Sequence, residues 1–379
     1  MTFELTEEQQ AVKEAAREFA QKELLPGVIE RDEHQTFPHE QIKKLGELGF
    51  MGIMTDAQYG GSGMDTISYV VAMEEISKVD ASAGVCMSVN NSLFCWGVEK
   101  YGTEAQKKEW LVPVAKGEIL GAFALSEPEA GSDATSQKTT AIDMGDHYLL
   151  NGTKNWITNG GNATHYIVIA QTHAELAHKG INALLVKKGT PGFTIGKKEN
   201  KLGIRSSDTH SLMFQDVKVS KENRLGPEGF GFKYAMETLN GGRIGIAAQA
   251  LGIAAGAYEL SLSYSKERKA FGKEISQHQA IQFKLADMEM EIQAARLLCY
   301  QAAWLKDQGK DYAKASAMAK LYTSEVAMKT TIEAVQIHGG YGYVKEFHVE
   351  RLMRDAKITQ IYEGTSEIQR IVIAREILK

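Results

Sequence analysis

Residues 148–160 read YLLNGTKNWITNG, a stretch in which apolar and β-branched residues alternate with polar ones around two Asn–Gly pairs. An alternating pattern broken by Asn and Gly is typical of strands and turns, and not of a helix. We interpret residues 151–161, NGTKNWITNGG, as a β-hairpin with an exposed Trp156, followed by Ile157 and Thr158; packing of Trp156 in a core is the alternative. Because the parts of the chain before and after it have helical patterns, this strand-like stretch indicates an α+β fold.

Short runs of the same kind continue beyond this stretch. They alternate or are rich in β-branched residues, and Gly, Asn and Asp separate them. The runs are YIVIAQT at 166–172, NALLVKK at 182–188, GFTIG at 192–196 and SLMFQDVKV at 211–219. We therefore predict a small antiparallel β domain over residues 119–226.

The part of the chain before the β region has helical signals. Thr6 with Gln9 and Thr103 with Gln106 each have the spacing of a capping box, which marks the first turn of a helix. Between them, apolar residues recur at intervals of three and four around one glycine-rich turn. Residues 1–118 are therefore predicted to form an N-terminal all-helical domain.

The helical pattern returns after the β region. Apolar residues recur every three or four positions over 276–307, as on the buried face of a long helix. Residues 244–258 are small or apolar nearly all round, which predicts a central helix with neighbours on several sides. This run is interrupted by Gln249 and is too short and too mild to span a bilayer, so no membrane is expected. We predict a C-terminal bundle of long helices over 227–379.

Composition and charge exclude several classes of protein. With 379 residues, 43% of them hydrophobic and 24% charged, the chain has the composition of a globular protein of two or three subdomains. The net charge of -5 and the absence of a Lys/Arg block argue against a nucleic-acid partner. The three scattered cysteines and the acidic first residues predict a cytoplasmic location. The ten histidines are dispersed, so no metal is expected.

The segment FALSEPEAGSDATS at 123–136 concentrates hydroxyl groups after an apolar strand. Such a loop presents many donors to a polar ligand, although on composition alone an ordinary β-turn is the commoner explanation. The chain lacks the GxGxxG and GxxxxGK[ST] motifs, so a nucleotide would not be held by a Rossmann turn or a P-loop. It also lacks a GxSxG nucleophile elbow, which disfavours a hydrolase.

The stretch ITQIYEGTSEIQR at 358–370 places one acid, Glu363, between an aromatic residue and a glycine. Ser366 and Gln369 have capping-box spacing, so a helix is expected to begin at Glu367. One explanation is electrostatic, because an acid just before a helix is stabilised by the helix dipole. The apolar residues in front of Glu363 favour a buried carboxylate instead, whose pKa burial would raise toward that of a usable base.

Five segments together resemble the signature sequences of the acyl-CoA dehydrogenase family, in family order and across essentially the whole chain: FALSEPEAGSD, NGTKNWITN, ERKAFGK, QIHGGYGY and IYEGTSEIQR. Four further pieces, MSVNNSLF, KLGIRSSDTH, GRIGIAAQALGIA and IQFKLADM, are most similar to its short-chain, butyryl-CoA branch. The resemblance implies an N-terminal helical domain, a middle antiparallel β domain and a C-terminal four-helix-bundle domain. It also implies FAD between the β domain and the bundle, and a homotetramer built as a dimer of dimers.

The resemblance further implies an activity and the residues that carry it. Enzymes of this kind perform flavin-dependent α,β-dehydrogenation of short-chain acyl-CoA thioesters to trans-2-enoyl-CoA and pass the electrons to an electron-transferring flavoprotein. Glu363 matches the catalytic base of the family. Some members carry the base at the position that corresponds to Gly242, which has no carboxylate, so Glu363 is the candidate base that the resemblance implies. The FAD contacts implied are Phe123, Leu125, Ser126, Ser132, Trp156, Ile157, Thr158, Arg268, Phe271, His278, Gln279, Gln336, Gly339, Gly340, Thr365 and Glu367. The substrate contacts implied are Ser132, Asn240, Arg243 and Gly364.

Other functions remain open at this point. The preferred acyl chain could be branched or of medium length, because one sequence does not show the depth of the acyl-chain pocket. An acyl-CoA oxidase or a flavin monooxygenase of the same fold would hand the electrons to oxygen. A non-catalytic acidic scaffold, or a nucleic-acid binder like one DNA-repair relative of this fold, belongs to another class. Both Glu363 and the net charge of -5 argue against that class.

Overall fold

Helices form the first third of the chain in the computed structural model, which describes residues 4–379. Both capping boxes are present, because the side chains of Thr6 and Thr103 accept hydrogen bonds from the N–H groups of Gln9 and Gln106. The all-helical character is thus confirmed for the described residues. The helices are α1 (Glu7–Phe19), α2 (Val28–His34), α3 (His39–Glu47), α4 (Thr66–Val79), α5 (Ala81–Ser88), α6 (Trp96–Tyr101), α7 (Glu104–Gln106) and α8 (Val112–Ala115), with π-helical turns at Ala20–Leu24, Val89–Cys95 and Lys107–Leu111.

The middle of the chain forms a sheet in the order β6-β7-β3-β2-β4-β5-β8, with β1 also paired to β4. The strands are β1 (Gly121–Ala124), β2 (Thr140–Asp143), β3 (His147–Thr158), β4 (His165–Gln171), β5 (Ile181–Lys187), β6 (Phe193–Lys198), β7 (Thr209–Ser220) and β8 (Arg224–Leu225). The prediction of a purely antiparallel domain is wrong in one respect, because β1 and β2 pair with β4 in parallel. A hairpin reverses the chain, whereas β1 reaches β4 only after a long connection through β2 and β3.

The prediction of a hairpin over residues 151–161 is wrong. Residues 148–158 belong to one long strand, β3, which pairs with β7 and shifts register at Gly152 and again before Ile157. The chain turns only after Thr158. A Cβ on Gly152 would lie 2.5 Å from Oγ1 of Thr139, so this glycine permits a close approach within the sheet and does not mark a turn. The second bulge leaves Trp156 at a φ of 62° and 60% exposed, which excludes core packing of its ring.

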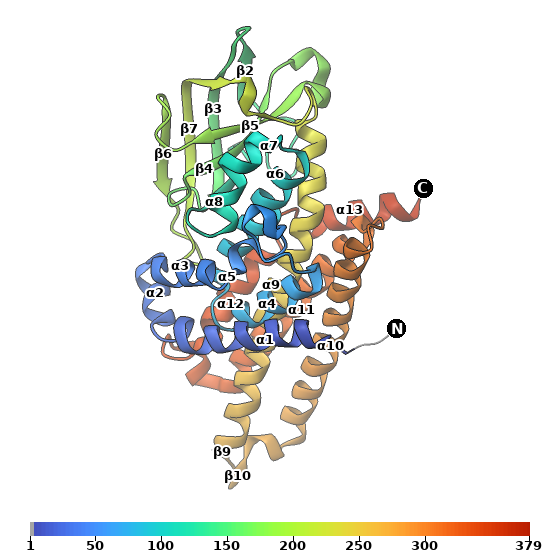
Figure 1. Ribbon diagram of the computed structural model, residues 1–379. Helices are drawn as coiled ribbons and strands as arrows, with labels where there is room; N and C mark the ends of the chain where they lie inside the picture. Colours follow the sequence, from blue (N-terminus) through green and yellow to red (C-terminus); the bar gives the residue numbers. More distant parts are fainter. Residues whose placement is uncertain (1–3) are drawn as a thin grey trace.

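The last part of the chain is helical again, as predicted. Its helices are α9 (Gly231–Glu267), α10 (Gln279–Asp307), α11 (Ala313–His338), α12 (His348–Thr359) and α13 (Ser366–Ile377). A small hairpin of β9 (Lys269–Ala270) and β10 (Lys273–Glu274) joins α9 to α10. Figure 1 shows this hairpin at the end of the molecule opposite the large sheet, with α9 running most of the distance between them.

Helix α9 is the central helix. By length and composition it could cross a membrane, but 83% of its most apolar window is buried inside the protein, as for a core helix. It packs against α4, α10, α11 and α12. A Cβ on Gly252 or Gly256 would overlap backbone atoms of α4, so these glycines allow the two helices to approach closely, as the sequence predicts.

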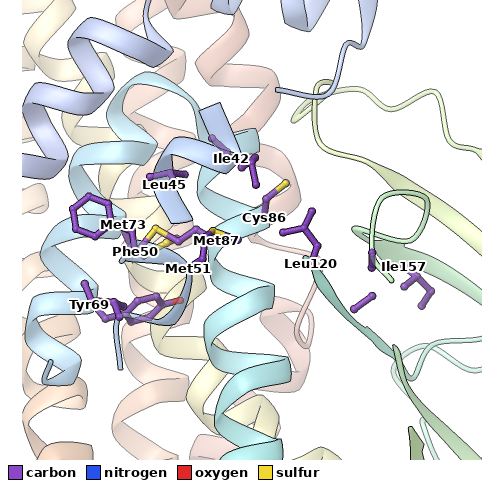
Figure 2. Packing of buried hydrophobic residues seen from close by; sticks show 14 of the residues in the cluster. Ile42, Leu45, Phe50, Met51, Tyr69, Met73, Cys86, Met87, Leu120 and Ile157 are labelled. Atoms are coloured by element: carbon purple, nitrogen blue, oxygen red, sulfur yellow. The ribbon is translucent and has the colours of Figure 1, made fainter. Parts of the chain in front are cut away.

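One hydrophobic core joins the N-terminal helices to the sheet. Figure 2 shows side chains of these helices packed together, with Leu120 and Ile157 from the β region beside them. Met51, Tyr69 and Leu120 all belong to the same buried cluster. Because this core is continuous, the strand that carries Trp156 is held firmly against the helices.

Candidate active site

Glu363 lies in the connection between α12 and α13, in an unusual backbone conformation. Its φ is 52° and that of Gly364 is 92°, so two successive residues are left-handed and turn the chain sharply. The predicted capping box at Ser366 is wrong by one residue: Thr365 is the N-cap and accepts a hydrogen bond from the N–H of Ile368. Helix α13 therefore begins at Ser366, because the side chain nearest to the left-handed turn caps it.

The Glu363 carboxylate faces the interior. Its Oε2 is buried and has no hydrogen-bond partner among the described residues. Burial raises the pKa of Glu363 to about 7, against the opposing charges of Lys320 and Arg243. A Cβ on Gly242 would overlap Oε2 of Glu363 and would lie 2.8 Å from Cδ2 of Leu93. The absence of a side chain at Gly242 is thus what makes room for this carboxylate.

Arg243 and Asn240, two of the residues implied for substrate binding, lie on the same stretch of α9. Nη1 of Arg243 donates to Oδ1 of Asn240 at 2.6 Å, and its Nε is buried without a partner in the part of the chain that the structure describes. Burial lowers the pKa of Arg243 to about 10, and the charge of Glu363 opposes this shift. With Gly364 directly after Glu363, the structure brings these three residues to the base. The fourth, Ser132, lies on the exposed loop between β1 and β2.

The loop after β1 and the end of β3 are tied together. Phe123 lies in β1, and Leu125 and Ser126 follow it. Nζ of Lys154 donates to the carbonyl of Leu125 at 2.9 Å, and the N–H of Asn155 donates to the carbonyl of Ser126 at 2.9 Å. Trp156, Ile157 and Thr158 come directly afterwards, so seven of the implied FAD contacts, including Ser132, share this region.

Part of the hydroxyl-rich loop has a local role. Oγ1 of Thr135 donates to Asp133 at 2.7 Å, and Oγ of Ser136 donates to the same carboxylate. These two hydroxyls stabilise a turn, which is the commoner explanation considered for this composition. Ser126 and Ser132 are the hydroxyls of this loop that remain as candidate ligand contacts.

A further group of implied FAD contacts lies at the other end of the molecule. Arg268 ends α9 with its guanidinium 5.5 Å from the Tyr341 ring, and Phe271, at a φ of 52°, is 96% exposed. A Cβ on Gly339 or Gly340 would meet nothing within 4 Å, so a ligand could approach the backbone there. The remaining members of the group are His278, Gln279 and Gln336. Figure 1 shows β9 and β10 at the end of the molecule opposite the large sheet. Within one chain, this group of implied FAD contacts is therefore separated from the group at β1 and β3.

The last two implied FAD contacts belong to α13. Thr365 caps the helix, and Glu367 is exposed in its first turn. A backbone N–H lowers the pKa of Glu367, as expected for an acid at a helix start. Across residues 4–379, no cluster of three His, Cys, Asp or Glu side chains is placed to hold a metal ion.

Three family models match consecutive parts of the chain. They are described as the N-terminal, middle and C-terminal domains of acyl-CoA dehydrogenase, and they match residues 6–118, 122–217 and 229–378. The chain belongs to the acyl-CoA dehydrogenase family. Its architecture of helices, sheet and helices is that of the family.

Full-length relatives support the same assignment. The short-chain specific acyl-CoA dehydrogenase of Clostridium acetobutylicum is 51% identical, with 100% of both chains covered. The butyryl-CoA dehydrogenase structure from Megasphaera elsdenii is 51% identical over 100% of both chains, with a TM-score of 0.98. A structure reported for the electron transferring flavoprotein of Acidaminococcus fermentans and flavin-based electron bifurcation has a matching chain, 53% identical over 100% of both chains, with a TM-score of 0.99. A FAD complex of PigA is 29% identical, covering 100% of this chain and 99% of that one, with a TM-score of 0.95.

Four residues of the site have roles that sequence reasoning does not predict. Lys154 is fully buried in β3 and donates to Oε1 of Glu127 at 2.7 Å. Lys320 is fully buried in α11, and Gln369 is buried in α13; both contact the turn after Glu363. A lysine within a run of small residues, as in AKASAMAKLY at 313–322, is the signal that could have indicated Lys320.

Replacement of Gly242 by alanine tests the space around the base. The new methyl group would overlap the Glu363 carboxylate and crowd Leu93, so the carboxylate must move. We expect acyl-CoA turnover to fall about 100-fold with FAD still bound, because a small misplacement of a reacting group has effects of this size. Gly241→Ala is the matched control, since its nearest neighbour would be the Tyr312 hydroxyl at 4.0 Å. Equal turnover of the two variants would show that Gly242 does not shape the site.

Proposed function

We propose that this chain is a short-chain acyl-CoA dehydrogenase that uses FAD to convert acyl-CoA thioesters to trans-2-enoyl-CoA. The observation that carries the proposal is the carboxylate of Glu363 in a chain of this family without a second carboxylate at Gly242. Its Oε2 is buried with no hydrogen-bond partner among residues 4–379, and burial raises the pKa of Glu363 to about 7. Full-length identity of about half to short-chain specific and butyryl-CoA dehydrogenases supports the choice of substrate.

The chemistry follows from the position of Glu363. The α-proton beside a thioester is weakly acidic, so its removal needs a base near neutral pKa in a site that excludes water. Glu363 would accept this proton at its carboxylate and thereby lose a buried charge. Bound FAD supplies the acceptor for the hydride that leaves the β-carbon. The family resemblance implies that the Glu363 N–H and a ribityl hydroxyl stabilise the enolate oxygen.

The chain's residues fit FAD, although the fit needs two chains. Trp156 and Phe271 expose flat rings at positions with positive φ, and open space adjoins Gly339 and Gly340. These features lie at opposite ends of one chain, so we propose that the Arg268 to Gly340 group completes the FAD site of a partner chain. The proposal also includes all the other FAD contacts that the family resemblance implies.

A homotetramer would cover apolar surface that one chain leaves open. Large apolar side chains are exposed along three C-terminal helices: Phe283, Met290, Leu297 and Trp304 on α10; Met318, Tyr322 and Ile332 on α11; Ile371 and Ile377 on α13. Surfaces of this kind mark protein interfaces. We therefore keep the dimer of dimers as part of the proposal, together with the domain division at 118/119 and 226/227 and a cytoplasmic location.

The buried surroundings of the base favour a short acyl chain. Gly242, Gly245 and Gln249 lie along one face of α9. A Cβ on Gly245 would lie 2.5 Å from Oγ of Ser88, and Gln249 accepts a hydrogen bond from the hydroxyl of Tyr362. Side chains therefore fill this face beyond the carboxylate. Medium or branched chains remain alternative substrates.

The test is spectroscopic. The purified protein should show a yellow flavin spectrum that bleaches when butyryl-CoA is added without oxygen. Bleaching by a panel of straight and branched acyl-CoAs should be fastest with the short straight chains. A colourless protein that FAD does not reconstitute would defeat the proposal. Faster reoxidation by an electron-transferring flavoprotein than by air would separate a dehydrogenase from an oxidase or monooxygenase.

A further inference from the structure

Lys320 has no exposed surface, which is unusual for a lysine. It lies in the first third of α11, and its Nζ donates to the carbonyl of Gly364 at 2.6 Å. Burial lowers the pKa of Lys320 to about 8, and the charge of Glu363 is the largest influence that opposes this shift. A buried cation is stable only with close partners, so the turn and the carboxylate beside it account for its presence.

The Gly364 carbonyl accepts two side-chain hydrogen bonds. Besides Lys320, Nε2 of Gln369 donates to it at 2.8 Å and also to the carbonyl of Glu363 at 3.1 Å. These donors come from α11 and α13, on either side of the two left-handed residues. A non-glycine residue such as Glu363 keeps a positive φ only where its surroundings hold it there. The two donors therefore fix the direction in which the Glu363 side chain leaves the backbone.

The charged groups around Glu363 come from several elements. Lys320 on α11 and Arg243 on α9 both lower its pKa, against the effect of burial. Tyr362 and Tyr69 are neutral phenols, since burial raises the pKa of each above its ordinary value. The acids Glu325 and Glu367 also face Lys320 and favour its charged form. Among these groups, Lys320 is the cation that also hydrogen-bonds the turn.

We propose that Lys320 is a positioning residue of the active site, whose ammonium group holds the Glu363–Gly364 turn and keeps the Glu363 carboxylate ionised near neutral pH. The inference rests on the proposed role of Glu363 as the base. It assigns two separable effects to one side chain. The hydrogen bond sets where the carboxylate lies, and the positive charge sets how much of it is ionised.

The experiment measures how the rate of anaerobic flavin bleaching by saturating butyryl-CoA depends on pH. The wild-type rate should rise with pH through about 7, because the base must be ionised. In Lys320→Met the midpoint of this rise should move to a pH about one unit higher or more. Loss of an opposite charge near a carboxylate raises the pKa of the carboxylate by about this amount. A shift of one unit lowers the ionised fraction of Glu363 at pH 7 from about one half to about one eleventh, so the rate at pH 7 should fall at least about fivefold. Lys320→Arg, which keeps the charge, should leave the rise close to that of the wild type.

Two further variants separate the charge from the hydrogen bond. Lys320→Gln keeps a hydrogen-bond donor without the charge. Its midpoint pH should therefore move upward as in Lys320→Met, but its maximal rate should fall less. Gln369→Met removes donors to the same carbonyls without a change of charge, so it should lower the maximal rate and leave the rise in place. Lys306→Met removes another lysine, which is half-buried and whose pKa burial likewise lowers to about 8, and should change neither quantity.

The outcomes distinguish this inference from the proposed function. The pH at which the carboxyl C=O infrared band of Glu363 disappears, identified by its loss in Glu363→Gln, should shift together with the kinetic rise. If Glu363→Gln keeps normal turnover, the base itself is misassigned. If Glu363→Gln is inactive but the methionine and glutamine variants of Lys320 titrate like the wild type, Lys320 has only a structural role. Should Lys320→Met not fold, Lys320→Gln decides the question alone.

Discussion

Glu363→Gln should lower the rate of flavin reduction by butyryl-CoA by a factor of about 10⁴. The amide has nearly the same shape as the carboxylate but does not accept a proton from the α-carbon. Oε2 of the carboxylate is buried beside Gly242, which offers no replacement base. Flavin content and the binding of a non-reacting acyl-CoA analogue should stay close to wild type. Stopped-flow measurement of anaerobic bleaching separates the lost chemical step from binding.

A matched control keeps this result specific. Glu47 is an exposed acid on α3, far along the chain from the site, and Glu47→Gln should bleach at the wild-type rate. Bleaching of Glu363→Gln within tenfold of the wild type would move the base to another residue.

The same variant has a stability signature with a definite sign. Burial raises the pKa of folded Glu363 from 4.5 to about 7, so the folded protein binds this proton more tightly than the unfolded chain. The associated stability is present below about pH 4.5 and is lost as the pH rises to about 7. At pH 8 the neutral Glu363→Gln variant should therefore be more stable than wild type by up to about 3 kcal/mol. Melting temperatures at pH 5 and pH 8 measure this difference, which should shrink at the lower pH.

Lys154→Met should reduce the free energy of unfolding by about 3–5 kcal/mol, because it leaves a buried charge without its partner. Burial alone would raise the pKa of Glu127, but the charge and hydrogen bond of Lys154 hold it below its ordinary value. Without Lys154, Glu127 keeps only the backbone N–H groups of Lys138 and Thr139. The carbonyl of Leu125 loses its donor as well, so FAD should bind more weakly.

Urea unfolding of the FAD-free protein at pH 7 checks this value. The double variant Lys154→Met with Glu127→Gln should recover part of the lost stability, because the unpaired charge is gone. Lys138→Met is the surface control: its ion pair with Glu129 is exposed on both sides, and such pairs contribute about 0–1 kcal/mol. A loss below about 1 kcal/mol for Lys154→Met would show that the buried pair does not hold this loop.

Local patterns predicted most of the fold correctly. The spacing of Thr6 and Gln9 identified the start of a helix, and the small residues from 244 to 258 identified a buried one. These signals are local, because capping and helical periodicity depend on residues a few positions apart. The errors arise where a contact from outside the local stretch overrides a local signal. Asn151–Gly152 is a turn signal, yet Gly152 serves a bulge against Thr139, which lies outside the window of such a signal.

The sequence by itself determined the order of helices, strands and helices, the family, and Glu363 as the candidate base, since these depend on periodicity and on residue identity at motif positions. Only the tertiary structure decided what surrounds that base. Lys320 and the Gly364 carbonyl are 44 residues apart along the chain, and the contact between Gly242 and Glu363 joins α9 to the turn before α13. Burial and the field of nearby charges come from every element packed around a group, so no local pattern contains the pKa of Glu363.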